Sequence, residues 1–94
     1  MHEWIYTQPD GGFELLLPDG RARRNGLYAS GVVIDAWAKK RGDMKTGQAY
    51  LVLSLRTGKH RYWPMPTLAW AEQAAQQIVM HLTALREAAH ADCG

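Results

Sequence analysis

Short stretches in which hydrophobic and polar residues alternate fill the first two thirds of the chain. Together with β-branched and aromatic runs, they predict strands at residues 3–7, 13–17, 27–40, 48–56 and 59–63. Glycine, proline and aspartate lie between several of these stretches, where they favour turns. The pattern therefore predicts an antiparallel sheet, with Gly31 marking a bulge inside the longest strand.

A different periodicity follows this region. Residues 68–89 are rich in strong helix formers and contain no Gly or Pro, and Thr67 suits an N-cap. Apolar side chains recur there at spacings of four and three, which places them on one helix face: Ala71, Ala75, Ile78, Leu82, Leu85 and Ala89. We therefore expect a single α+β domain over residues 1–94. An antiparallel sheet of four to five strands (about 3–63) would carry one long C-terminal helix on one face, followed by a short tail at 91–94.

The Thr57-Gly58 pair predicts a two-residue hairpin turn. Such a turn would place Leu53 opposite Tyr62 and Val52 opposite Trp63. Because alternate side chains lie on opposite faces of a strand, Leu53 and Tyr62 would face the helix and Trp63 would face outward. A shift of one residue in this register would invert the assignment.

The preceding strand follows the same alternation. The side chains expected to face the core are Val32, Ile34, Ala36 and Ala38. Those expected to point outward are Val33, Asp35, Trp37 and Lys39. The outer face of the sheet would therefore combine aromatic rings with cations.

Charge is distributed unevenly along the chain, although the net charge is only +2. Residues 1–20 carry four acidic side chains and no Lys or Arg. Residues 21–61 carry ten Lys and Arg against two Asp. This asymmetry concerns partners rather than fold, and it favours an anionic partner for the second segment.

The outer sheet face and its adjoining basic loops are the candidate binding site. Cations there can neutralise phosphates, and aromatic rings can stack on unpaired bases. The alternative is a solvated sheet face whose rings cover their neighbours, and a protein partner is as well supported as a nucleic acid. The candidate residues are Trp37, Lys39, Lys40, Arg41, Tyr50, Arg56, Lys59, Arg61 and Trp63, with Arg21, Arg23 and Arg24 in a loop.

The polar face of the helix uses amides more than charges, and large apolar residues lie beside its main stripe. Gln73, Gln76 and Gln77 form most of this face, with Trp70 and Met80 nearby. Such a face suits self-association, so a homodimer through the helix is one interpretation. The alternative is that a broad sheet covers a broad apolar face.

Catalytic and metal-binding patterns are missing from the sequence. It contains no GxSxG, Walker or HExxH pattern, and its histidines are scattered. We therefore expect a non-enzymatic protein with no cofactor and no metal site. The single Cys93 indicates a reducing, cytoplasmic setting, since no disulfide can form within the chain. We see no signal peptide and no apolar run of the roughly 20 residues that span a membrane.

Residues 27–85 resemble the arm-type DNA-binding domain of tyrosine recombinases in layout. The hairpin TGKHRYW is followed by the helix start TLAWAEQAA, and the strands at 3–17 are additional. In that family a three-stranded sheet reads DNA and a helix packs behind it. The resemblance implies DNA contacts at Trp37, Lys39, Arg56, Lys59 and Arg61.

The whole chain is also similar in style to small α+β proteins of phages and mobile elements, among them the anti-CRISPR proteins. Compact size and a leading sheet followed by a helix are the shared features. The similarity implies a phage-encoded inhibitor that docks on a host protein or nucleoprotein complex, such as a CRISPR effector. The alternative is a module that binds DNA or RNA directly through the outer sheet face.

Overall fold

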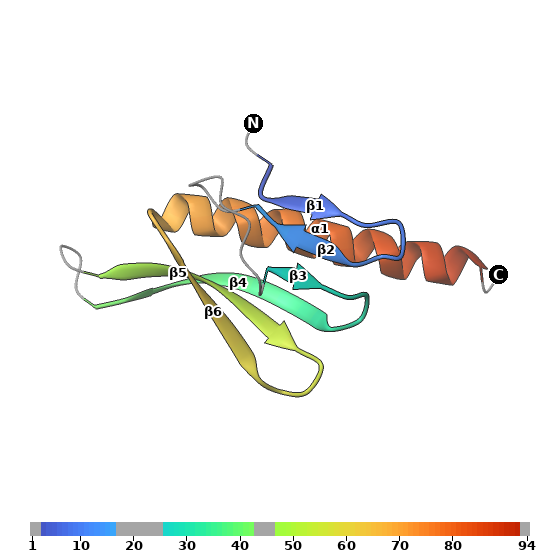
Figure 1. Cartoon of the computed structure of the whole chain (residues 1–94), viewed down its shortest axis with the longest axis horizontal. Coiled ribbons are helices and arrows are strands. Elements are labelled where there is room, and N and C mark those ends of the chain that lie inside the picture. Colours follow the sequence, from blue (N-terminus) through green and yellow to red (C-terminus); the bar gives the residue numbers. More distant parts are fainter. Residues whose placement is uncertain (1–2, 17–25, 43–46, 93–94) are drawn as a thin grey trace.

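The structure is a computed structural model that describes residues 3–16, 26–42 and 47–92. Its elements are β1 (Ile5–Thr7), β2 (Phe13–Leu15), β3 (Leu27–Tyr28), β4 (Val33–Arg41), β5 (Gln48–Leu55), β6 (His60–Met65) and α1 (Leu68–Asp92) (Figure 1). The predicted α+β fold with antiparallel strands and a C-terminal helix is confirmed. The predicted single sheet of four to five strands is not, because the described strands form two antiparallel sheets, ordered β1-β2-β3 and β4-β5-β6.

The two sheets separate at a turn that interrupts the predicted strand 27–40. The Val32 amide donates to the Ala29 carbonyl across 3.2 Å, which closes a four-residue turn. Gly31, the third residue of this turn, has a φ of +83°. Only glycine adopts such a φ at little cost, so β3 ends at Tyr28 and β4 begins at Val33.

The bulge in this region lies three residues after Gly31, at Ile34. It falls between Val33 and Asp35 and changes which side chains face the core. Val33 is buried, whereas Ile34 is exposed, so the predicted orientation of these two residues is wrong. Beyond the bulge the predicted alternation holds, since Ala36 is buried and Trp37 is exposed.

The loop between β5 and β6 is longer than the sequence predicts. The Leu55 amide donates to the Lys59 carbonyl across 2.8 Å, and the Gly58 amide donates to the Leu55 carbonyl across 2.9 Å. Residues 56–58 therefore form a three-residue loop, with Gly58 at a φ of +91°. This geometry belongs to hairpins in which a turn is followed by a left-handed glycine.

The longer loop shifts the register of the hairpin by one residue. Leu51 pairs with Trp63, and Val52 pairs with Tyr62. The predicted pairing of Val52 with Trp63 is therefore wrong, and so are the faces predicted for Tyr62 and Trp63, whereas Leu53 faces the core as predicted. Trp63 lies in the core at 7% exposure, whereas Tyr62 lies outside at 40% exposure.

Helix α1 begins at the predicted cap. The Thr67 hydroxyl accepts a hydrogen bond from the Trp70 amide across 3.1 Å. Small residues of the predicted stripe, such as Ala71 and Ala75, are buried and allow the helix backbone to lie close to the strands. The stripe is confirmed through Leu85, which is half-buried, but Ala89 is exposed.

The first sheet is fastened to the helix by polar as well as apolar contacts. The Trp4 amide donates to the Gln77 side-chain oxygen across 2.7 Å, and the Trp4 indole donates to that of Gln73 across 3.3 Å. His81 forms a 2.9 Å hydrogen bond to the Gly11 carbonyl. Because the carbonyl can only accept, the Nε2 atom of His81 is the donor. Two of the amides that indicated self-association thus contact Trp4 within the chain.

Candidate binding face

The candidate site is the outer face of the second sheet, defined as the face turned away from α1. On the inner face, Leu51, Leu53 and Trp63 belong to the core cluster that includes the buried side of the helix. Figure 1 shows α1 and the first sheet on the same side of β4–β6. Strand pairing arranges the outer side chains in rows across the sheet: Asp35–Ser54–His60, Trp37–Val52–Tyr62 and Lys39–Tyr50–Pro64, with Arg41–Gln48 beyond.

Aromatic rings form a layer over the centre of this face. The ring centroids of Trp37 and His60 are 5.2 Å apart at an interplanar angle of 87°. Those of Tyr50 and Tyr62 are 6.0 Å apart at 90°. Both pairs have the edge-to-face geometry that aromatic quadrupoles favour. Val52 lies centrally among these four rings, and its side chain is 0% exposed although it lies outside the main core cluster.

Cations border this aromatic layer. The Arg41 guanidinium carbon lies 5.0 Å from the centroid of the Tyr62 ring, which is a cation–π contact. Lys39 is exposed in the row beside Trp37. The Asp35 carboxylate accepts a 2.8 Å hydrogen bond from the Ala36 amide, so it interacts with the backbone of its own strand.

Four of the predicted binding residues lie together on this face, and they are Trp37, Lys39, Arg41 and Tyr50. Arg56 and Lys59 are exposed in and beside the hairpin loop, at the opposite end of β5 from Arg41. Lys40 pairs with Ala49 and is exposed on the other side of the sheet. Arg21, Arg23 and Arg24 lie outside the described residues.

Two predicted binding residues face the other way. The Trp63 indole donates a 2.8 Å hydrogen bond to the Tyr28 hydroxyl inside the protein. Arg61 pairs with Leu53, and its guanidinium carbon lies 5.9 Å from the centroid of the Trp63 ring. Both side chains therefore serve the contact between the two sheets, and their predicted outward orientation is wrong because of the loop length.

The surroundings of Tyr28 in this inner cluster shift the pKa of its hydroxyl. Burial raises the pKa of its hydroxyl above the usual value of 10.0. The hydrogen bond from Trp63, then the positive charge of Arg61, lower the pKa and oppose this effect. The phenol thus stays neutral into alkaline pH, and the indole N–H keeps its acceptor.

Sequence reasoning missed Tyr62 and His60 as outer-face residues. Both assignments follow from the register, and the register follows from the loop. A hairpin loop that contains a single glycine fits two or three residues, and the Thr57-Gly58 pair does not by itself exclude the longer one. The burial of apolar side chains distinguishes the two registers better, because only the three-residue loop buries the large Trp63 side chain opposite Leu51.

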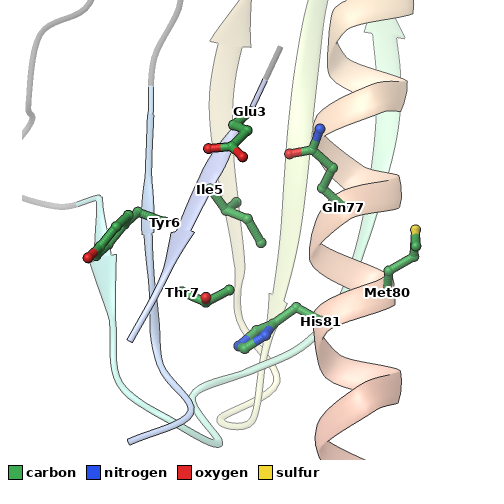
Figure 2. Close-up of a pocket in the computed structure, with 7 residues that line it drawn as sticks. All are labelled: Glu3, Ile5, Tyr6, Thr7, Gln77, Met80 and His81. Carbon is green, nitrogen blue, oxygen red and sulfur yellow. The ribbon is translucent and has the colours of Figure 1, made fainter. Parts of the chain in front are cut away.

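A separate hollow lies between β1 and α1. It has a volume of about 620 Å³ and is lined by Glu3, Ile5, Tyr6, Thr7, Gln77, Met80 and His81. Figure 2 shows Ile5 pointing from β1 toward the helix and Gln77 and His81 pointing back. Gln77 and His81 already form hydrogen bonds to residues of the first sheet and its turn. The hollow is therefore part of the contact between packed elements. Among the described residues, no group of three or more His, Cys, Asp or Glu could hold a metal ion.

Comparisons with protein-family models, with curated proteins and with solved structures found no match for this chain. Within the described ranges, no helix is both long and apolar enough to cross a membrane.

Proposed function

We propose that this chain is a non-enzymatic binding protein that engages nucleic acid through the outer face of β4–β6. The observation that carries the proposal is the exposed aromatic layer on an open sheet face. At its centre Trp37 and Tyr62 are 36% and 40% exposed, and Lys39 and Arg41 border them. A contiguous patch of exposed apolar side chains, rimmed by polar residues, is typical of an interaction site.

The chemistry of this face suits a polyanion with flat rings. Every nucleobase has a π-face, and stacking on an aromatic side chain stabilises binding without reading sequence. Lysine and arginine side chains neutralise phosphates and release their counterions. The segment from residue 21 to residue 61, which supplies the β4 and β5 side chains of this face, has ten Lys and Arg against two Asp.

A second candidate function is docking on a host protein or nucleoprotein complex, as a phage-encoded inhibitor of a defence system such as CRISPR would do. The specific observation in its favour is the orientation of Arg61 and Trp63. Both lie on the side of β6 that faces the first sheet, so the outer face lacks the Arg61 charge that the sequence predicts there. Tyr62 and His60 take the place of Trp63 on that face. Aromatic anchors around a buried aliphatic residue, here Val52, are typical of the centre of a protein interface.

A salt series separates these two functions. We expect fluorescently labelled, mixed-sequence DNA and RNA to bind at micromolar or lower concentration in low salt, and the affinity to fall steeply as salt rises. The double variant Lys39→Gln/Arg41→Gln should bind more weakly. Its log–log salt slope should be shallower by up to about 1.4 for a single strand, since two phosphate contacts are removed.

The matched control for this experiment is Arg86→Gln, which removes one exposed cation from α1. Arg86 contacts the Ile34 carbonyl at 3.4 Å and lies away from the outer face. The control should leave the salt slope unchanged. If neither DNA nor RNA binds in low salt, direct nucleic-acid binding is wrong, and affinity capture of a protein partner that depends on Trp37 becomes the test of the second function.

A further inference from the structure

We infer that the outer face takes a short stretch of single-stranded nucleic acid, and that the rings of Trp37 and Tyr62 stack on its bases. This inference depends on the proposed function and specifies the class of ligand. Trp37 lies on β4 and Tyr62 on β6, in one row on either side of Val52. Two strand spacings place their backbones about 10 Å apart.

The centre of the face is suited to stacking and poorly suited to reading a duplex. Base edges in a groove are read mainly by arginine, lysine and amide side chains. The central row has none of these, because it consists of Trp37, Val52 and Tyr62. In a duplex the π-faces of the bases are hidden in the stack, whereas an unpaired base can offer its face to a ring.

Cations lie at both ends of the aromatic layer. Lys39 and Arg41 are near the end of β4, where Arg41 pairs with Gln48. Arg56 is exposed in the hairpin loop, directly after the other end of β5. The seven-residue step from Gln48 to Leu55 along β5 spans about 23 Å. A single strand that follows β5 can therefore place phosphates at both ends and bases over the rings between them.

Arg41 also prepares the face for this ligand. Its guanidinium carbon, 5.0 Å from the centroid of the Tyr62 ring, places a positive charge beside a stacking surface. A nucleotide needs these two groups together, because its base and phosphate are joined through one sugar. Arginine at such a position can contact the phosphate while its plane remains against the ring.

The test compares labelled oligo(dT) of about 4 to about 16 nucleotides, the usual range for a small single-strand site, with a mixed-sequence single strand and its duplex. We expect single strands to bind more tightly than the duplex. Trp37→Ala and Tyr62→Ala should each weaken single-strand binding by about 5- to 150-fold, the effect of losing one stacked base. The control is Tyr6→Ala, which removes a tyrosine that is 59% exposed on β1. It should leave the affinity for single strands unchanged.

Trp37→Phe separates the loss of a stacking ring from the loss of folding. This variant keeps an aromatic ring beside Val52, so it should retain most of the affinity for single strands. Equal or tighter binding of duplex, or ring variants that bind single strands like the parent, would overturn the inference. If Lys39→Gln/Arg41→Gln still weakened binding in that case, the proposed function would stand without it. Absence of binding to every oligonucleotide in low salt would overturn both.

Discussion

Tyr62 and Trp63 are neighbours in the chain, yet one lies on the outer face and the other lies in the core. The three-residue loop before β6 decides this arrangement, since a two-residue loop would exchange their faces. Burial of Trp63 also accounts for the position of Tyr28, whose hydroxyl accepts the indole N–H. The same register brings Tyr62 into contact with Tyr50 and Arg41 on the outer face.

Tyr28 should make the stability of the protein sensitive to alkaline pH. Burial raises its pKa in the folded state above the 10.0 expected when the chain unfolds. The stability that depends on the neutral phenol is therefore complete below about pH 10 and is lost as the pH rises through the folded-state pKa. Urea unfolding at pH 8 and pH 11 should show a smaller loss in Tyr28→Phe than in the parent.

The control for this comparison is Tyr6→Phe, which removes an exposed tyrosine of the first sheet. Its stability should fall between the two pH values as much as that of the parent. An equal fall in Tyr28→Phe would show that the Tyr28 hydroxyl does not contribute to the alkaline sensitivity.

Secondary-structure elements with strong local signals could be predicted from the sequence. Thr67 caps the helix as expected, and the spacing of Ala71, Ala75 and Ile78 identifies its buried face. The division into two sheets could not be predicted, because apolar residues on both sides of Gly31 are compatible with one bulged strand. Loop length was equally ambiguous, so Trp37 was placed correctly on the outer face and Trp63 was not.

Gly31 should be required for the turn that separates β3 from β4. A Cβ atom there would meet no heavy atom within 4 Å, so the cost of a substitution comes from the backbone alone. At a φ of +83°, Gly31→Ala should lower the free energy of unfolding by about 1–2 kcal/mol. Gly31→Asn should lower it less, because asparagine tolerates this conformation better. Urea unfolding measures both, and an unchanged or more stable Gly31→Ala would contradict the turn geometry.

Within the residues that the structure describes, the first sheet and its flanking residues carry acidic side chains, whereas most of the charged side chains of the second sheet are cations. Glu3, Asp10 and Glu14 are carried by the first sheet and its turn, whereas Lys39 and Arg41 are on the second. A polyanion approaching the protein should be repelled by the former and attracted by the latter, which orients the outer face toward it. The side-chain orientations, the hairpin register and the charge distribution thus all favour the outer face as the binding site. The cations at 21, 23 and 24 lie outside the described residues.

The most direct test of this account uses the indole N–H signals of the four tryptophans in an ¹⁵N-correlated NMR spectrum. Single Trp→Phe variants assign the signals, and oligo(dT) is then titrated into the labelled protein. If the outer face binds the oligonucleotide, the Trp37 signal shifts progressively, whereas the signals of Trp4, Trp63 and Trp70 change little. A Trp37 signal that stays in place while another indole shifts, or a spectrum that does not change in low salt, would contradict the assignment of the outer face as the nucleic-acid site.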